Sequence, residues 1–155
     1  MVEIDEFLSP QRMVLGLRSG SKRQLFQDLA TMAAAATGLD PAVILAALSQ
    51  REKLGTTGIG EGIAIPHARV KQLTSMTGFF ARMATPVDYD ALDDAPVDLI
   101  FLLLAPEEAN AVQLKALARI ARLLRDPEVC ARLRREPELS AVYDLLVGRA
   151  PGAAA

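Results

Sequence analysis

The sequence predicts one α/β domain, a three-layer α/β/α sandwich around a mixed central β-sheet. The length of 155 residues suits one domain, and 51% hydrophobic with 23% charged residues is typical of a globular protein. Hydrophobic periodicity and turn signals divide the chain into a strand, two helices, about three strands and further helices. Adjacent strands can pair as hairpins, whereas strands joined through helices pair in parallel, so this order predicts a mixed sheet. We find no internal repeat, and expect a core over about 8–147 and a frayed tail over 149–155.

The N-terminal part predicts a strand and two helices. The apolar stretch 13–17 predicts the strand, and Ser21 is an N-cap for a helix that extends to about Thr37. An Asp-Pro pair at 40–41, an N-cap followed by proline, begins a second helix that extends to about Lys53. The residues expected on the buried faces of the two helices are Leu25, Leu29, Met32, Ala33 and Ala36, and Val43, Ile44, Ala47 and Leu48.

The middle of the chain combines a glycine-rich segment with strands. Residues 55–62 contain four glycines, and the short apolar alternation 63–65 follows them. Met76–Met83 predicts a strand, and Val97–Ala105 predicts a strand buried on both faces because it is apolar without alternation.

The C-terminal part predicts three helices. The first extends over about 110–125, the second begins at the Asp-Pro pair 126–127 and extends to about Arg135, and the last covers 141–147. The residues expected inside the first of these helices are Leu114, Leu117, Ala121 and Leu124.

Composition excludes several classes of function. The net charge of −2 gives no electrostatic basis for binding nucleic acid or an anionic membrane. Cys130 is the only cysteine and cannot form an internal disulfide, and one Cys with one His cannot build a zinc site, so we expect no metal. The N-terminus has no apolar signal region, and the longest apolar run, 99–105, is far shorter than the ~20 residues of a membrane helix. We therefore expect a soluble, cytoplasmic protein.

His67, the only imidazole in the chain, is the leading candidate for chemistry. It follows Pro66, which cannot donate to a strand ladder, so the side chain is expected at a strand end. A neutral imidazole nitrogen is a competent nucleophile near pH 7. An ordinary surface histidine is the simpler interpretation of a lone imidazole, and the neighbouring residues have to decide between the two.

The glycine-rich segment can serve either as a turn or as an anion-binding loop. Around Gly58 and Gly60, backbone N–H groups could approach an anion closely. No Gly-Lys-Ser/Thr follows, as a Walker loop requires, and Ile63 stands where a dinucleotide fingerprint has its third glycine. A nucleotide site is therefore disfavoured.

Arg51 occupies an unusual position for a cation. It lies three residues after Leu48 and seven after Ile44, on the apolar stripe at the C-terminal end of the second helix. One interpretation is an ordinary interaction with the helix dipole and last carbonyls. The other is a guanidinium that recognises a phosphoryl group through two parallel hydrogen bonds.

The segment from Arg51 to His67 strongly resembles the phosphorylation-site signature of the fructose/mannitol-type enzyme IIA family of the bacterial phosphotransferase system. The resemblance is strongest to its nitrogen-regulatory branch. It continues through 85–87, 91–101 and 114–133, and so covers nearly the whole chain between about 8 and 147.

The resemblance implies a phosphoryl carrier and regulator with the α/β/α fold, a phosphotransferase component. His67 would accept the phosphoryl group from the carrier HPr or its nitrogen-branch paralogue, which a phosphoenolpyruvate-dependent enzyme I charges. Arg51 would steady the group, with Thr57 close to it and the N–H groups around Gly58 and Gly60 assisting. No cofactor is expected, because the donor's phosphohistidine is already activated.

Two positions depart from the family pattern. The family commonly has a second active-site histidine where this chain has Gln113, which can donate a hydrogen bond but cannot become cationic. Ala68-Arg69 stands where the nitrogen branch often has Gly-Lys, so the charge is kept.

Three other functions compete with this interpretation. One is a sugar-specific enzyme IIA that passes the group to a IIB subunit of a fructose/mannitol-type permease. Another is a regulatory binding module that controls partners, such as kinases or transporters, and that phosphorylation switches. The nitrogen-branch resemblance favours this regulatory output combined with phosphorylation of His67. A hydrolase using His67 with Cys130 is disfavoured, because the two residues lie in unrelated elements.

Overall fold

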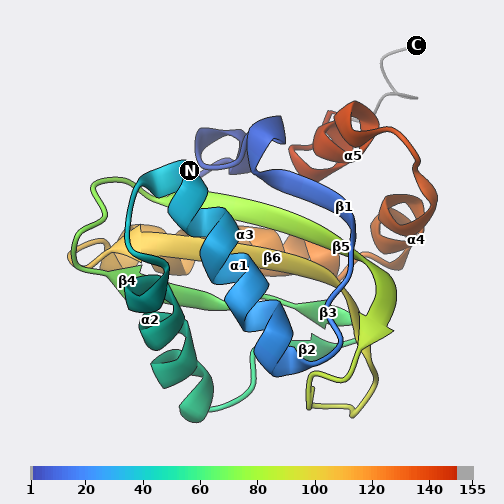
Figure 1. Cartoon of the computed structure of the whole chain (residues 1–155). Coiled ribbons are helices and arrows are strands. Elements are labelled where there is room, and N and C mark those ends of the chain that lie inside the picture. The colour runs from blue at the N-terminus through green and yellow to red at the C-terminus, as the bar shows by residue number, and fades with distance from the viewer. Residues whose placement is uncertain (1, 150–155) are drawn as a thin grey trace.

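The computed structural model describes residues 2–149 of the chain as three layers (Figure 1). Helices α1 and α2 cover one face of the central sheet, and α3, α4 and α5 cover the other. The helices are α1 (Lys22–Thr37), α2 (Pro41–Lys53), α3 (Asn110–Leu124), α4 (Pro127–Arg135) and α5 (Leu139–Leu146). This arrangement confirms the predicted α/β/α sandwich. No helix within 2–149 has the length and apolar character needed to cross a membrane.

The sheet is mixed, as predicted. Its strands are β1 (Met13–Leu17), β2 (Gly58–Gly60), β3 (Ile63–Ala64), β4 (His67–Val70), β5 (Thr77–Val87) and β6 (Val97–Pro106). They are ordered β1-β5-β6-β3-β2, and β4 also pairs with β6. The pairs β1/β5, β3/β6 and β4/β6 are parallel, whereas β5/β6 and β2/β3 are antiparallel.

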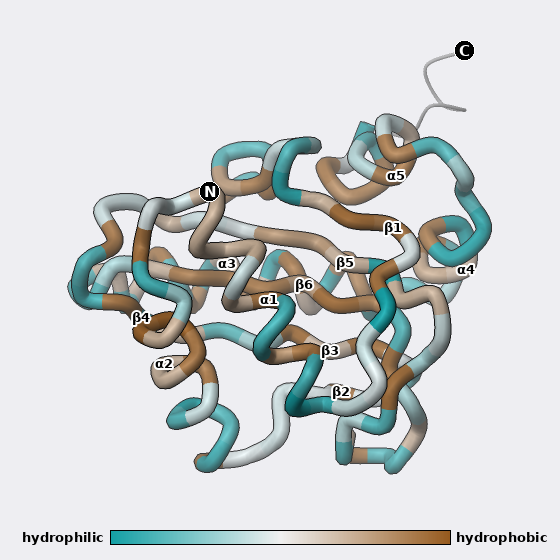
Figure 2. The backbone as a smooth tube through the Cα atoms, viewed as in Figure 1, coloured by the Kyte–Doolittle hydropathy of each residue, from teal (hydrophilic) through white to brown (hydrophobic). Residues whose placement is uncertain are grey.

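Strand β6 lies between two apolar cores, and Figure 2 shows that it consists largely of apolar residues. Successive side chains of a strand point to opposite faces. Ile100 and Leu102 accordingly pack with α1 and α2, while Leu99 and Phe101 pack with the three C-terminal helices. The prediction of a strand buried on both faces is confirmed.

Helix starts agree with the sequence signals. The Ser21 hydroxyl accepts a hydrogen bond from the Gln24 N–H, and the Asp40 and Asp126 carboxylates accept one from Ala42 and Glu128. These side chains satisfy backbone donors that the first turn leaves free, which is why each helix begins where it does.

The central strands are more numerous than the sequence predicted. Where about three strands were expected between α2 and α3, from the alternation 63–65 and the stretches 76–83 and 97–105, the structure has five, because 58–60 and 67–70 also form short strands. Three or four residues are too few to display a period of two, so the sequence pattern did not reveal these two strands. Strand β5 also extends four residues past its predicted end at Met83.

Three predicted core positions are wrong. Leu114 is 68% exposed, Val43 is 36% exposed, and Ala36 is also exposed. The buried side chains of α3 are Gln113, Ala116, Ile120 and Leu124. The buried stripe of this helix is thus displaced by one residue from the expected one at its first three positions, whereas Leu124 is buried as expected.

The core also begins earlier than residue 8. Ile4 and Phe7 are each 1% exposed and belong to the core formed with α3, α4 and α5. A 3-10 helix, Ile4–Glu6, brings these side chains inward. Of the predicted tail at 149–155, residues 150–155 lie outside the described part of the chain.

Candidate functional site

His67 is the first residue of β4, so its predicted place at a strand end is confirmed. The strand runs parallel to β6 with His67 opposite Leu103, whose N–H donates to the Pro66 carbonyl. Pro66 thus contributes an acceptor to the sheet without needing a donor of its own. The imidazole is half-buried at the edge of this pairing.

The two ring nitrogens of His67 have different partners. Nδ1 lies 2.9 Å from the Ile65 carbonyl oxygen, and Nε2 accepts a hydrogen bond of 3.2 Å from Arg51 Nε. A carbonyl oxygen can only accept, so Nδ1 carries the proton and Nε2 keeps its lone pair. The imidazole is therefore fixed in the tautomer whose nucleophilic nitrogen faces the guanidinium.

Arg51 lies in the last turn of α2 and has two acceptors. Besides the bond to His67, its Nη1 donates to the Gly55 carbonyl at 2.9 Å. The sequence left open two interpretations of this cation, an interaction with the helix dipole and last carbonyls or recognition of a phosphoryl group. In the structure the guanidinium spans from a carbonyl in the turn after α2 to the His67 imidazole.

The surroundings of His67 favour its neutral form. Burial lowers the pKa of the imidazole below its ordinary value, and the positive charge of Arg51 lowers that pKa further. The hydrogen bond to the Ile65 carbonyl and the charge of Glu52 act in the opposite direction and do not outweigh the first two effects. A neutral imidazole near pH 7 is the form that can act as a nucleophile.

A cavity of about 780 Å³ opens beside His67 between α2, β4 and α3. Its lining residues are Ala47, Gln50, Arg51, Lys53, Leu54, His67, Ala68, Arg69, Gln113, Leu114 and Leu117. The structure therefore brings together three of the predicted site residues, namely His67, Arg51 and Gln113. Gln113 is 7% exposed, in the first turn of α3.

Arg69 also lines this cavity, and the sequence interpretation gave it little weight. Alternate residues of a strand share a face, so a position two residues after His67 in β4 is on the histidine's side of the sheet. Arg69 donates a hydrogen bond to the side chain of Asn110, the first residue of α3. The spacing of two residues from His67 could have identified Arg69 as a site residue, but only if β4 had been recognised as a strand.

Thr57 is not directed at His67. It is 4% exposed, and its hydroxyl lies 2.7 Å from Glu52 Oε1 and 2.7 Å from the Tyr89 hydroxyl. Its N–H donates to Glu52 Oε2 at 2.8 Å. Thr57 therefore belongs to a buried polar cluster behind Arg51.

Gly58 and Gly60 also lie away from the cavity and have packing reasons to be glycine. A Cβ at Gly58 would be 2.7 Å from the Ala91 Cβ, closer than real side chains approach. Gly60 has a φ of 103° and lies beside the Asp93 carboxylate. The Gly58 N–H donates to the Thr56 hydroxyl. These glycines allow β2 to approach the loop around 89–93.

Cys130 lies apart from His67. The thiol is 5% exposed in α4 and donates to the Leu124 carbonyl, and burial raises its pKa. These features describe a packed core thiol, not a nucleophile. Within 2–149, no group of three or more His, Cys, Asp or Glu side chains is placed to hold a metal ion.

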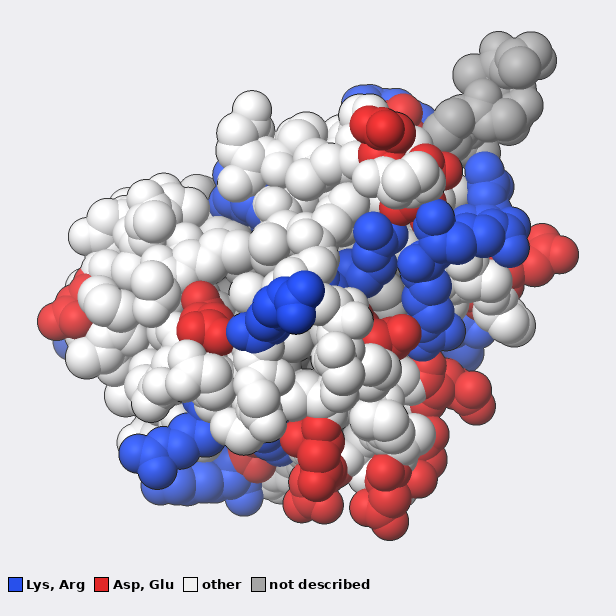
Figure 3. Space-filling model, turned by 45° about the vertical axis from the view of Figure 1, so that its right-hand side comes forward, with Lys and Arg blue, Asp and Glu red and all other residues white. Residues whose placement is uncertain are grey.

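Charges of both signs are spread over the face shown in Figure 3, and neither sign covers it. This distribution agrees with the small net charge of −2 and lacks the wide basic surface typical of nucleic-acid binding.

Comparison with known proteins gives a consistent result. Residues 6–148 match the family model for the phosphoenolpyruvate-dependent sugar phosphotransferase system, EIIA 2. A nitrogen regulatory protein of Bradyrhizobium diazoefficiens is 47% identical over 143 residues, covering 92% of this chain and 94% of that protein.

Solved structures show the same fold. Nitrogen regulatory protein IIA-Ntr from Neisseria meningitidis superposes with a TM-score of 0.89 at 36% identity, covering 92% of this chain and 98% of that one. Enzyme IIA mannitol from Escherichia coli, in a complex with phosphorylated enzyme IIB mannitol, reaches 0.78 at 22% identity, covering 92% and 98%. At that identity the second likeness concerns the fold alone.

Proposed function

The chain belongs to the EIIA type 2 family of the phosphotransferase system, in its nitrogen-regulatory branch, and from this premise we propose that it carries a phosphoryl group on His67. The observation that carries the proposal is the pairing of His67 Nε2 with Arg51 Nε at 3.2 Å, with the proton on Nδ1. That arrangement presents a nucleophilic lone pair beside a fixed positive charge at the wall of an open cavity.

The proposed reaction is a phosphoryl exchange between two histidines. The Arg51 Nε–H first leaves Nε2 and turns to a phosphoryl oxygen, which frees the Nε2 lone pair. That lone pair forms a bond to phosphorus while the donor's phosphorus–nitrogen bond breaks, and the electron pair of the broken bond returns to the donor imidazole. His67 keeps its Nδ1 proton throughout, held by the Ile65 carbonyl, so no base is needed on this side. Catalysis then consists of positioning and charge neutralisation. Arg51 supplies the nearest positive charge, and Arg69 and Lys53 line the same cavity.

The proposed donor is HPr or its nitrogen-branch paralogue, and the proposed output is regulatory. A phosphoryl group adds about −1.5 to −2 charges at neutral pH, which would change the charge of the cavity rim. Partner proteins such as kinases or transporters would distinguish the two states. The name of the 47% identical relative, nitrogen regulatory protein, supports this output. Since such a donor works in the cytoplasm, we place the protein there.

The alternative output is transfer to a IIB subunit of a fructose/mannitol-type permease. One observation favours it, the 38% identity over 119 residues with a fructose-specific EIIA component of Haloferax volcanii, which covers 77% of this chain. The two outputs use the same phosphorylated His67. Incubating the phosphorylated protein with such a IIB subunit separates them, because only the alternative predicts rapid loss of the group to IIB.

The proposal is tested with enzyme I, the HPr-type carrier and phosphoenolpyruvate, followed by intact mass measurement. We expect one added phosphoryl group that acid removes, as a phosphorus–nitrogen bond requires. His67→Ala should add none, whereas Cys130→Ser should behave as the unaltered protein, because the thiol lies in a different part of the fold. Phosphorylation of His67→Ala would refute the assignment.

A further inference from the structure

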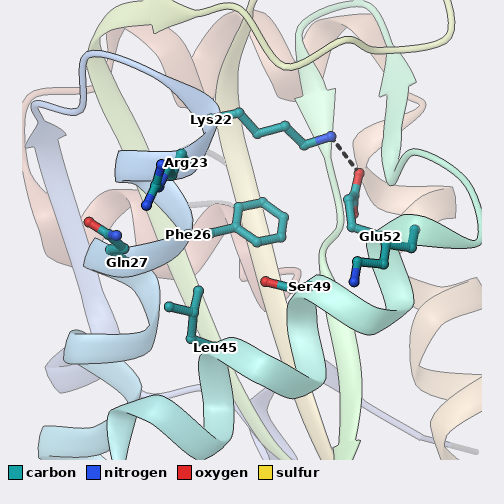
Figure 4. Close-up of a pocket in the computed structure, with 8 residues that line it drawn as sticks. Lys22, Arg23, Phe26, Gln27, Leu45, Ser49 and Glu52 are labelled. Atoms are coloured by element: carbon teal, nitrogen blue, oxygen red, sulfur yellow. Dashed lines mark hydrogen bonds and ion pairs between the residues drawn. The ribbon is translucent and has the colours of Figure 1, made fainter.

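Glu52, next to Arg51, has no part in the transfer chemistry, yet it is the acceptor in a dense set of hydrogen bonds. Its side chain is 12% exposed and accepts from Lys22 Nζ at 2.8 Å, from the Thr57 N–H at 2.8 Å and from the Thr57 hydroxyl at 2.7 Å. Figure 4 shows Lys22 reaching from α1 to Glu52 near the end of α2. Burial alone would raise the pKa of Glu52, but these bonds outweigh it and hold the pKa below its ordinary value.

The set extends through Thr57 to Tyr89. The single hydroxyl proton of Thr57 goes to the carboxylate, which only accepts, so the Tyr89 hydroxyl is the donor to Thr57 at 2.7 Å. Burial raises the pKa of Tyr89, which keeps that proton in place. Lys22 Nζ also lies 4.4 Å from the centre of the Tyr89 ring. Lys22 and Thr57 therefore donate to the Glu52 carboxylate directly, and Tyr89 donates to the Thr57 hydroxyl behind it.

These bonds act on the segment that orients Arg51. Glu52 fixes Thr57 at one end of the turn after α2, and the Gly55 carbonyl within that turn accepts from Arg51 Nη1 at 2.9 Å. The other side of the guanidinium donates to His67 Nε2. Backbone bonds also hold this turn, since the Gly55 N–H donates to the Glu52 carbonyl and the Ile65 N–H donates to the Thr57 carbonyl. Loss of the carboxylate should therefore leave the turn formed but shift the Gly55 carbonyl that aims the guanidinium.

We propose that Glu52 is a positioning residue for phosphoryl transfer, which orients Arg51 toward His67 by fixing Thr57 and the Gly55 carbonyl. The inference rests on the proposed function of His67. This role differs from a purely structural one, because the effect of Glu52 on the rate of transfer would depend on the Arg51 guanidinium.

A double-mutant cycle on the rate of transfer tests this route. Glu52→Gln places an amide N–H₂ against donors and should lower the rate by about tenfold through misplacement of the guanidinium. Arg51→Ala should lower it by about ten- to a hundredfold, as loss of a charge-assisted bond predicts. In the double variant the rate should equal that of Arg51→Ala within about twofold, since coupled residues are not additive. Fully multiplicative losses would overturn the proposal.

Asp98→Asn is the matched control. Within residues 2–149, Asp98 forms the other ion pair as short as that of Glu52, with Arg134 at 2.8 Å, and its side chain is 22% exposed. It lies at the far end of β6 from Leu103, the partner of His67. Its loss should reduce stability without slowing transfer. An equal slowing by Asp98→Asn and Glu52→Gln would mean that Glu52 acts only through stability, and would overturn the proposal.

A second readout does not depend on phosphorylation. The Arg51 Nε–H resonance, identified by its loss in Arg51→Lys, should exchange slowly with water because it is bonded to His67 Nε2. Glu52→Gln, or Thr57→Val if the first variant does not fold, should make this exchange several-fold faster, and unchanged exchange would overturn the inference. If the unaltered protein accepts no phosphoryl group, the proposed function fails, and this readout still decides whether Glu52 orients Arg51.

Discussion

The His67 imidazole is expected to stay neutral over a wider pH range than a free histidine. Burial, and then the Arg51 charge, lower its pKa, so an NMR titration of this only imidazole should have its midpoint below the ordinary value of about 6.5. The transfer rate should be constant above about pH 6.5 and should fall only as the pH drops through the folded-state pKa. A midpoint at or above about 6.5 would contradict this account.

The free energy of unfolding should change over the same pH range in which His67 titrates, and should be lower at the acidic end of that range. The unfolded chain binds a proton on His67 at a higher pH than the folded protein does. The contribution of His67 to the free energy of unfolding is therefore fully present above the unfolded pKa, and is lost as the pH falls through the folded pKa. His67→Gln serves as the control, because that contribution should be absent from its stability-versus-pH curve.

Gln113 is a second residue at which pH dependence can be engineered. It is 7% exposed and lines the cavity with His67, in the first turn of α3, where anions are favoured. Gln113→His should introduce a second ionisation into the pH profile of transfer, at or below about pH 6.5 because burial disfavours the charged form, while His67 remains the only phosphorylated residue. Rates from about pH 5.5 to 8.5 would check this, with Lys115→His, an exposed position outside the cavity, as the control. Superimposable profiles for Gln113→His and the unaltered protein would contradict it.

At the scale of the element, helix α3 shows where sequence interpretation fails. Its leucines suggested a stripe that includes Leu114, but the structure leaves Leu114 68% exposed. Counting apolar residues assumes that every leucine is buried. That assumption fails in the first turn of α3, beside His67, where the helix forms a cavity wall rather than core.

The exposed Leu114 has a testable consequence for donor docking. It lines the cavity beside His67, so a carrier that reaches the histidine would cover it. Leu114→Ser should raise the KM for the phosphorylated carrier several-fold with little change in kcat, because the side chain does not touch the imidazole. The free energy of unfolding should stay within about 0.5 kcal/mol, as for other surface substitutions. A loss of stability without a change in KM would show that the side chain serves the fold instead.

Local signals nevertheless predicted most of the elements. Ser21, Asp40 and Asp126 begin their helices as expected, because a cap needs only its own first turn. The signature predicted that Arg51 and His67 would meet, across 16 residues of sequence. It did not predict the Glu52 cluster, since Lys22 and Tyr89 come from distant segments and only the fold brings them to Thr57.

At the scale of the whole molecule, the N-terminal residues complete one of the two cores. Phe7 is 1% exposed, and its ring packs edge-to-face with that of Phe101, the two ring centres being 6.1 Å apart. Its carbonyl accepts a hydrogen bond from the Gly78 N–H. Arg12 donates to the same carbonyl at 2.9 Å and to the Gly78 carbonyl at 3.0 Å. The segment before β1 is therefore attached to β5 and β6 from outside the sheet.

Phe7→Ala should accordingly lower the free energy of unfolding by about 3–5 kcal/mol, the usual cost of removing a buried aromatic side chain. The lost contacts are with Phe101 and the core formed with α3, α4 and α5, whereas His67 and Arg51 join α2 to β4. Chemical denaturation measures the stability, and the rate of phosphoryl transfer at a temperature where the variant is folded should remain unchanged. Glu6→Ala, an exposed change in the same segment, is the control, and a loss below about 1 kcal/mol for Phe7→Ala would place this segment outside the cooperative core.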